Sequence, residues 1–532
     1  MLSASGLYAA AALAQQGASF LLLPVYTRFV APAQYGQLEL LNAFSSIVFA
    51  CLVLGLPSAV TKTYHRDCAS DEERAAVLPT ALALGLPVLL AGGGLMAAAA
   101  GWLARLLLGV GGGPGAAGAA AAGAALGAGA GGALAGGGAA AGLAAGVEMV
   151  RLVAVTGVLA SLVAIVLASL RAEERALAFG ALTVAQFVTA MSLNILFVVR
   201  FGLGARGILW GNLLANAVAL ALALAVSFRR RGAPSPPPTG RAATRLRFSQ
   251  RLARPLLSFG VLLLPVLLSA WVLDLSDRYV LRLYAGLAAV AVYAVGYKVG
   301  MALQLAVVWP FQLAWPAVSF SISHRPGHQE TYSRTFTYLT AVMAFGIVGL
   351  TLGSRLALPL LVGPAYREAW RVVPWVALAY AFNGIHYCLS PGVHIAGKTR
   401  WFPLFALGCG AVNLGLNFLL IPRYGMMGAA WATAAAFACL ALATAWLSQR
   451  VYPVDYEYGR LLKVALATAL VLFLGTRLPP APGAAHPIAA AAEALLAVAG
   501  LPALLAAASF FTPAERLSLR RALRRQPTSA LG

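Results

Sequence analysis

Long apolar stretches alternate with short polar ones along almost the whole chain. Runs of about 20 apolar residues recur from Leu7 to Phe511, and a helix of that length crosses a hydrocarbon core of roughly 30 Å. Backbone polar groups must be satisfied within the segment in lipid, which favours helices. The pattern predicts an all-α membrane protein with about fourteen transmembrane helices, centred near Ala14, Ser46, Leu86, Leu162, Phe187, Ala217, Leu264, Gly300, Phe345, Phe382, Gly410, Ala436, Leu470 and Gly500.

Two stretches need separate interpretation. The run Leu7–Leu23 has no basic segment before it and leads into further spans, so we interpret it as a mature helix rather than a cleaved signal. The tract Gly111–Gly146 is almost entirely Gly and Ala, and glycine at that density disfavours a helix. We therefore expect a low-complexity insertion over about 110–147, in an external loop. The alternative is a pair of weak extra helices.

An internal repeat sets the expected domain organisation. The string NILFVVRFG (Asn194–Gly202) recurs as NFLLIPRYG (Asn417–Gly425), at an offset of 223 residues. Offsets between other matching segments change from 254 before the Gly/Ala tract to 220 after it, as an insertion requires. We expect two homologous six-helix bundles, residues 1–228 and 255–450, joined by a basic, Pro-rich linker at 229–254. Two additional helices (451–511) and a basic tail (512–532) follow.

Composition and charge restrict the class of protein further. The chain is 61% hydrophobic and 10% charged, with a mean hydropathy of +0.83, which excludes a soluble globular protein. Its net charge of +22 would indicate nucleic acid in a soluble protein, but here the basic residues lie in loops beside spans, where anionic lipids and topology explain them. Even-numbered loops and the tail hold 25 of them and odd-numbered loops 12, which predicts a plasma (inner) membrane protein with both termini cytoplasmic. The five scattered cysteines indicate no disulfide framework and no metal site.

Four strings carry a resemblance to a known family: PVYTRFVAPAQYGQLEL (Pro24–Leu40), LSDRYVLRLY (Leu275–Tyr284), AVYAVGYKVG (Ala291–Gly300) and LLIPRYGMMGAAWAT (Leu419–Thr433). They resemble the polysaccharide-transporter, or O-antigen-flippase, branch of the multidrug/oligosaccharidyl-lipid/polysaccharide (MOP) exporter superfamily. The resemblance implies a V-shaped pair of six-helix bundles that alternates between inward-open and outward-open states. It also implies a lipid-linked oligosaccharide as cargo, with the polymerase and glycosyltransferases of the same pathway as partners. The multidrug and peptidoglycan-precursor branches share the fold, so fold alone does not decide the cargo.

Basic residues within spans are the first candidates for cargo binding. A pyrophosphate head needs cations or donors in place of its lost hydration, and a cation within a span costs about 2.5 to 3.5 kcal/mol on insertion scales. The candidates are Lys298 inside the eighth span, with Tyr297 beside it, Arg28 near the end of the first span, and Arg278. The alternatives are a structural ion pair for Lys298 and an interfacial anchor for Arg28.

Polar residues at helical spacing are the second group. Gln15 in the first span, and Glu39 and Asn42 in the second, could line an aqueous cavity and bind sugar hydroxyls. Polar residues also hold transmembrane helices together, and that alternative stays open.

Titratable residues that could couple transport to an ion gradient form the third group. Asp274, Asp277, Arg278 and Arg282 follow one stripe of a helix, which could equally be a self-neutralising surface cluster. His386 and His394 lie about 12 Å apart on a helix, too far for one metal ion, but they could take part in proton coupling. Satisfied interior or interfacial histidines are the alternative.

Motifs for catalysis or nucleotide binding do not occur in the sequence, so we expect a non-enzyme without a cofactor. A multidrug or cation antiporter of the same superfamily is the nearest rival, although it needs buried carboxylates and few of the 16 acidic residues lie in spans. A membrane-embedded polysaccharide-assembly enzyme would need a large external loop with catalytic groups. A non-transporting scaffold of the assembly complex is the third alternative.

Overall fold

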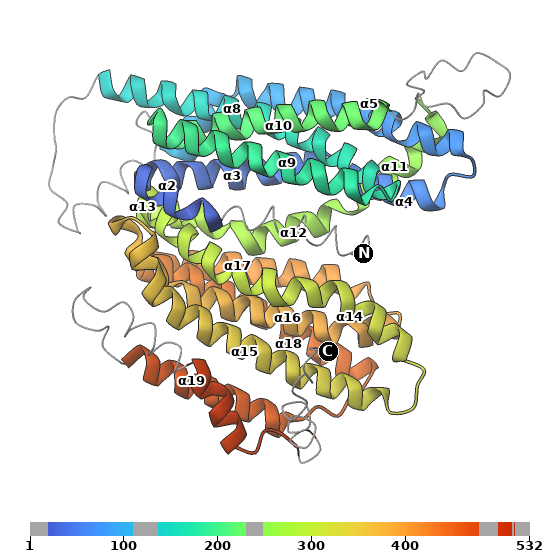
Figure 1. Cartoon of the computed structure of the whole chain (residues 1–532), viewed down its shortest axis with the longest axis vertical. Coiled ribbons are helices and arrows are strands. Elements are labelled where there is room, and N and C mark those ends of the chain that lie inside the picture. The colour runs from blue at the N-terminus through green and yellow to red at the C-terminus, as the bar shows by residue number, and fades with distance from the viewer. Residues whose placement is uncertain (1–19, 110–136, 230–247, 478–497, 513–514, 516–532) are drawn as a thin grey trace, which may run out of the picture. The chain divides into compact units, whose positions relative to one another are not determined.

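The computed structural model describes residues 20–109, 137–229, 248–477, 498–512 and 515 (Figure 1). Within these ranges the chain is almost entirely helical and contains no strand. Ten helices are long and apolar enough to cross a membrane, or up to eleven if the bent pair Pro364–Arg371 and Val373–Ile395 forms one span. The prediction of an all-α membrane protein is confirmed. The predicted count of fourteen spans is not confirmed by the described residues.

The difference in count has identifiable sources. Most of the predicted first span lies in residues 1–19, outside the described ranges, and of the predicted last span the structure describes only the part from Val498, with the apolar helix Val498–Ala507. The predicted seventh span, centred near Leu264, is divided between the helices Gln250–Leu262 and Leu264–Leu275, and the predicted eighth span lies in one continuous apolar run of 52 residues, Trp271–Ile322. A straight helix of that length would be about 78 Å long, far more than a membrane needs.

The chain folds back within that run. α12 (Leu264–Leu275) leads into α13 (Asp277–Gly300), and Gly286 inside α13 has φ 80° and ψ 176°, a conformation that L side chains rarely adopt. Asp277 accepts a hydrogen bond from Tyr293, 16 residues later, which a straight helix would place about 24 Å away. The two parts of α13 therefore form an antiparallel helical hairpin, with its bend at Gly286.

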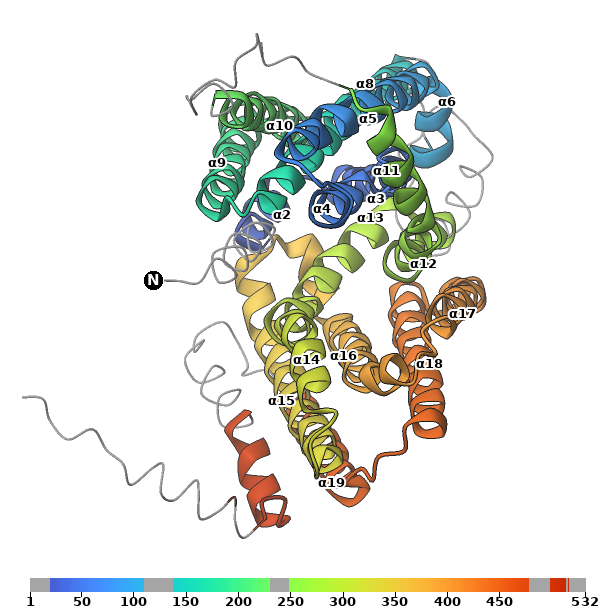
Figure 2. The ribbon, with the colours of Figure 1, turned by 90° about the vertical axis from the view of Figure 1, so that its right-hand side faces the viewer.

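One compact unit comprises residues 1–298, 361–369 and 403–436. At its centre α8 (Gly137–Ala172) packs against α3 (Pro32–Leu52), α4 (Leu56–Arg66), α5 (Asp71–Ala98) and α10 (Gly204–Arg229). α9 (Ala176–Ile195), continued by the π-helix Leu196–Arg200, lies beside α10 (Figures 1 and 2). The unit also contains α2 (Leu23–Phe29), α6 (Ala100–Leu103), the π-helix Ala104–Leu108, α11 (Gln250–Leu262) and most of α17 (Trp401–Tyr424).

α3 is held along α12 and the first part of α13 by contacts to its own backbone. Trp271 donates to the Ala43 carbonyl (2.8 Å), and Tyr279 donates to the Leu40 carbonyl (3.1 Å). A Cβ on Gly36 would lie 2.0 Å from the Leu287 carbonyl oxygen, so only glycine permits the approach beside the bend of α13. These contacts place the side of α3 that carries Glu39 against the hairpin.

The second compact unit comprises residues 299–360, 370–402 and 437–532. Its helices are α14 (Trp309–Ile322), preceded by the π-helix Gln304–Val308, α15 (His328–Leu361), α16 (Val373–Ile395), most of α18 (Met426–Val451) and α19 (Tyr458–Arg477). α19 packs on α15 through an apolar core that includes Val348, Leu352, Val464 and Val471. The 3₁₀ helix Pro364–Arg371 crosses the boundary between the two sets of residues.

Both copies of the sequence repeat have the same local geometry. In the first copy the helix ends at Arg200 and Gly202 has φ 65°, and in the second copy the helix ends at Tyr424 and Gly425 has φ 55°. Asn194 and Asn417, at equivalent positions, are both buried. The compact units group residues by contact rather than by repeat, so the domain boundaries expected from the repeat stay a prediction.

The end of the Gly/Ala tract differs from the expectation. Residues 137–147 are the first three turns of α8, not part of a loop insertion. Alanine is the best helix former, and here these turns extend a long apolar helix instead of having to nucleate one. Residues 110–136 lie outside the described ranges. α8 is one helix, so the extension adds no crossing.

The end of the predicted linker is also helical. α11 begins at Gln250, and Arg251 forms an ion pair with Glu73 near the start of α5. α5 itself begins at a cap in which the Ser70 hydroxyl accepts from the Glu73 amide (3.2 Å), with acidic residues throughout the first turn. Residues 230–247, and the tail apart from Thr512 and Glu515, lie outside the described ranges.

Substitution of Gly260 tests the packing at the break between α3 and α4, where Leu54 and Gly55 both have positive φ. A Cβ on Gly260 would lie 1.9 Å from the Leu54 carbonyl oxygen, so Gly260→Ala should destabilise the protein by about 1–3 kcal/mol. Thermal denaturation in detergent measures the change. Gly349→Ala, in α15 with no atom within 4 Å of its added Cβ, should be neutral or stabilising; equal losses in both variants would contradict the close approach.

Candidate functional site

Lys298 lies in a polar contact with α3 rather than alone in an apolar span. Its Nζ is 2.6 Å from Glu39 Oε1 and donates to the Tyr35 hydroxyl at 2.7 Å. Tyr35 and Glu39 are one helical turn apart on α3, so one face of that helix supplies both partners. The Lys298 side chain is 21% exposed and that of Glu39 9%. The pair is therefore largely, but not fully, withdrawn from solvent.

A second ion pair lies at the junction of α12 and α13. Arg278 Nη1 is 3.2 Å from Asp277 Oδ1 and donates to the Asp274 carbonyl at 2.7 Å. The two side chains are 4% and 1% exposed. The alternative interpretation of these residues as a surface cluster is therefore wrong, because α3 and the second arm of the hairpin cover the helical stripe that the spacing defined.

Tyrosines line both ion pairs. Tyr293 donates to Asp277, and Tyr297 donates to Asp274 at 3.1 Å. The Arg278 guanidinium lies 4.7 Å from the centre of the Tyr297 ring, and Lys298 Nζ lies 5.1 Å from that of Tyr35. Aromatic faces stabilise cations at these distances, most strongly where water is excluded. The rings therefore lower the cost of keeping two cations buried.

The buried cations retain hydrogen-bond donors that the described protein atoms do not use. Arg278 Nε is buried without a hydrogen-bond partner in this part of the chain. Lys298 has three N–H groups, and Tyr35 and Glu39 accept two of them. An unsatisfied donor in a low-dielectric site costs about 1–3 kcal/mol, which indicates that another acceptor, water or a ligand, completes the site.

Each cation in this cluster has a carboxylate partner, and Asp274 adds a third carboxylate beside them. Glu39 and Asp277 neutralise Lys298 and Arg278, and Arg278 also interacts electrostatically with Glu39. An interior dominated by cations, as the sequence suggested for this region, is therefore not what the described residues contain. Any anion that binds here has to compete with the carboxylates already present.

Three other predicted site residues are exposed or lie outside the described ranges. Arg28 is exposed in the last turn of α2, and Asn42 is exposed on α3. Gln15 lies outside the described residues. The cavity role expected for these three residues stays a prediction.

The two histidines belong to the second compact unit. His386 Nδ1 is 2.7 Å from the Thr444 hydroxyl, whereas His394 is exposed and its Nδ1 is 2.8 Å from the Ser390 carbonyl. Each ring thus has a local partner. Within the described ranges, no group of three or more His, Cys, Asp or Glu side chains could hold a metal ion.

Sequence reasoning missed several members of the site. Tyr35 and Thr433 both contact its charged residues, Thr433 at 3.5 Å from Asp277 Oδ2. Nearby, Ser276 donates to Asn413 (3.3 Å), which also accepts from Asn417. The sequence did point to Asn417, because this residue is the first of the second copy of the repeat. The others are single polar residues in apolar helices, and only the folded-back hairpin brings them together.

An apolar groove of about 630 Å³ lies within the second unit, between α15, α16 and α19. Its lining includes Met343, Ile347, Phe382, Ala465 and Phe473, with Thr340, Thr351 and Thr468 as its only hydroxyl-bearing side chains. A groove of this composition suits a hydrocarbon chain better than a polar solute.

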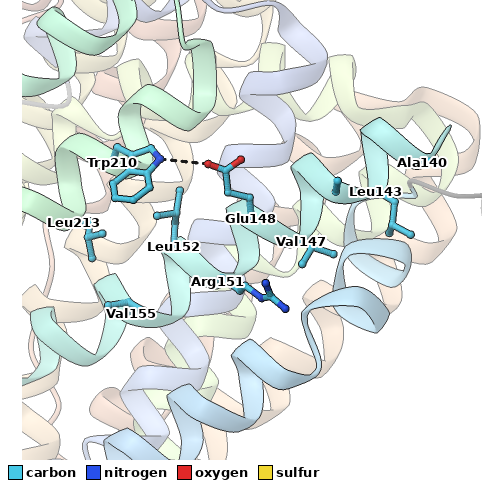
Figure 3. Close-up of a pocket in the computed structure, with 10 residues that line it drawn as sticks. Ala140, Leu143, Val147, Glu148, Arg151, Leu152, Val155, Trp210 and Leu213 are labelled. Carbon is cyan, nitrogen blue, oxygen red and sulfur yellow. Dashed lines mark hydrogen bonds between the residues drawn. The ribbon is translucent and has the colours of Figure 1, made fainter. Parts of the chain in front are cut away.

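A depression of about 650 Å³ lies between α8 and α10 (Figure 3). Trp210 donates to Glu148 at 3.3 Å, and Arg206 pairs with the same carboxylate at 3.2 Å. Both charged side chains are at least 40% exposed, in contrast to the buried pairs of the cluster. This pair is therefore a suitable control for variants of the buried ones.

Comparisons with known proteins find the same fold in solved structures of membrane transporters. The fold matches the lipid II flippase MurJ in its inward closed conformation, with a TM-score of 0.66 over 94% of this chain and 98% of that one, at 13% identity. It also matches an outward-facing multidrug resistance MATE family transporter of the MOP superfamily, with a TM-score of 0.53 over 87% and 96% of the two chains, at 14% identity. At such identities the likeness establishes the fold alone.

The sequence itself matches one family model. Residues 142–321 match the model described as "Polysaccharide biosynthesis protein". A comparison with curated protein sequences finds no match. The resemblance to the polysaccharide-transporter branch of the MOP superfamily is confirmed, and the chain is a multi-pass membrane protein.

Removal of one partner of the Asp277–Arg278 pair should destabilise the protein strongly. Asp277→Asn leaves Arg278 buried without its counter-charge and should cost about 3–5 kcal/mol, and adding Arg278→Leu should restore part of the loss. Glu148→Gln breaks an exposed pair and should cost no more than about 1 kcal/mol. Thermal unfolding of the purified full chain measures all three; a double variant less stable than Asp277→Asn would contradict charge pairing as the cause.

Proposed function

We propose that the protein is a flippase that moves undecaprenyl-pyrophosphate-linked oligosaccharide across the plasma (inner) membrane by alternating access, for the biosynthesis of cell-surface polysaccharide. The observation that carries the proposal is the buried cluster on α3 and α13, where Lys298 and Arg278 retain unused donors. A pyrophosphate offers several anionic acceptors and needs such donors where it leaves water. Transporters of the same fold act on lipid-linked cargo, as the name lipid II flippase states for MurJ.

Other features support the same function. The apolar groove between α15, α16 and α19 could hold part of the polyprenyl chain, whose hydrocarbon does not have to leave an apolar environment. The family model over residues 142–321 associates this fold with polysaccharide biosynthesis. In this proposal the polymerase and glycosyltransferases of the pathway act before and after transport, both termini are cytoplasmic, and the two bundles are residues 1–228 and 255–450.

The predicted site residues have distinct roles in this proposal. Lys298 and Arg278 bind the pyrophosphate, with Tyr297 beside them, while Arg28, Asn42 and Gln15 contact the saccharide or the rim of its pathway. Asp274 and Asp277 are candidates for ion coupling because they lie beside the binding cations, and His386 and His394 are candidates for proton coupling. Glu39 has a separate role as the ion-pair partner of Lys298.

A cation antiporter is the second candidate function, and one observation favours it. Glu39 and Asp277 are buried carboxylates, which a cation exporter needs and which equal the buried cations in number. The two functions make opposite predictions for variants: loss of a base should impair a flippase, and loss of an acid should impair a cation exporter.

Replacement of Lys298 tests the anion site. Lys298→Ala should abolish polysaccharide export at wild-type membrane abundance, because a desolvated pyrophosphate loses its cation, and Lys298→Arg should retain part of it. Translocation of lipid-linked saccharide in vesicles gives the direct measurement. Lys398→Ala removes an exposed lysine and serves as the control. Full activity of Lys298→Ala, combined with a loss in Glu39→Gln, would favour the cation exporter.

Narrowing the apolar groove tests the site proposed for the lipid chain. Ala465→Phe adds a ring that lies in the groove, so it should raise the KM for the lipid-linked cargo by about tenfold, equivalent to about 1.4 kcal/mol. Leu466→Phe changes the neighbouring residue, which does not line the groove and is 61% exposed. Equal effects of the two substitutions would remove the groove from the transport pathway.

A further inference from the structure

The carboxylates that already pair with the cations of the cluster create a difficulty for any anionic cargo. Lys298 already has a carboxylate at 2.6 Å, and Arg278 has one at 3.2 Å. A pyrophosphate that approached both pairs unchanged would meet two negative charges in a low-dielectric site, where like charges repel strongly. At least one carboxylate must give up its cation before the cargo can bind.

We propose that Glu39 is a built-in counter-ion that occupies Lys298 when the site is empty and is displaced by the pyrophosphate of the cargo. The proposal rests on the proposed function and adds a competitive step to it. Lys298 exchanges one anionic oxygen ligand for another, and no bond is made or broken. In the empty transporter the same contact keeps Lys298 from being a buried, uncompensated cation, so the site can close without cargo.

The contacts of the two acids identify Glu39 as the exchangeable one. Asp277 is 1% exposed and is held by Arg278, Tyr293 and Thr433 from three directions. Glu39 forms one ion pair, with Lys298. The side chain of Lys298 is the most exposed of the four in the two ion pairs. Displacing Glu39 therefore breaks one ion pair at the accessible side of the cluster, whereas displacing Asp277 would break several contacts in its interior.

Glu39 would not be left without compensation after the exchange. Tyr35, one turn before it on α3, interacts with its carboxylate through a hydrogen bond. Arg278 also attracts it electrostatically, so Glu39 keeps partial stabilisation while Lys298 binds the cargo. The Tyr35 hydroxyl contacts both members of the pair, so a short side-chain movement is enough for the exchange.

The exchange predicts opposite effects of one substitution on binding and on turnover. Glu39→Gln removes the competitor, so the Kd for undecaprenyl diphosphate should fall about tenfold. Turnover of lipid-linked saccharide should fall by a similar factor, because release is slower and the empty site now holds an uncompensated cation. Glu39→Asp keeps the charge but has a shorter reach, so its Kd should lie between those of the wild type and Glu39→Gln.

The experiment measures the Kd of undecaprenyl diphosphate for the full chain in lipid nanodiscs, and turnover in vesicles, for the wild type and five variants. These are Glu39→Gln, Glu39→Asp, Lys298→Ala, the double variant Glu39→Gln/Lys298→Ala, and Glu148→Gln. The last removes a carboxylate from the exposed pair with Arg206 and should behave as the wild type. Lys298→Ala should bind at least about tenfold more weakly, and the double variant should match it, because Glu39 acts only through Lys298.

Two outcomes separate the failure of this inference from that of the proposed function. If Glu39→Gln and Glu39→Asp bind no more tightly than the wild type while Lys298→Ala loses binding, Glu39 is only a structural partner and the anion site stands. If Lys298→Ala binds as the wild type does, the anion site itself is wrong. Glu39→Asp retains the charge balance of the folded cluster, so it decides the question even if Glu39→Gln does not fold.

Discussion

Two buried ion pairs impose the main constraint on this molecule. A chain in which 61% of residues are hydrophobic places Lys298 and Arg278 among apolar helices, and neither cation could remain there alone. Lys298 is stabilised by Glu39 and Tyr35, which precede it by 259 and 263 residues. Arg278 is stabilised by the adjacent Asp277 and by Tyr297 on the second arm of the hairpin. The arrangement of α3 and α13 is therefore tied to the pairing of these charges as well as to apolar packing.

The backbone geometry of α13 follows from the same constraint. The hairpin bend at Gly286 brings Tyr293 and Tyr297 back to Asp277 and Asp274, and Gly36 lets α3 approach the bend closely. Glycine is required at both places for different reasons, a positive φ in one and the absence of a Cβ in the other. The hydrogen bonds that Trp271 and Tyr279 donate to backbone carbonyls of α3 then hold the side of α3 that carries Glu39 against the hairpin.

A cluster in which each buried cation has its own carboxylate has a functional consequence that a cluster of unpaired cations would not have. Its paired charges can stay buried without cargo, and its cations still have N–H groups that the described protein atoms do not use. A transporter has to return its empty site across the membrane, and a site that carries its own counter-ion avoids exposing an unpaired charge to the apolar interior during that step. In the proposed exchange the same carboxylate competes with the cargo for Lys298, so that only a strongly anionic ligand displaces it.

The sequence by itself determined the fold class and singled out Lys298 as a candidate, because apolar run length and a cation within a span are local signals. It also placed Glu39, Asp277 and Arg278 among the candidates. Only the tertiary structure decided that Lys298 pairs with Glu39, that Arg278 is buried, and that residues 137–147 extend α8. The reason is physical: pairing and burial depend on which helices meet, and that depends on the bend at Gly286 and on close backbone approaches between segments distant in sequence.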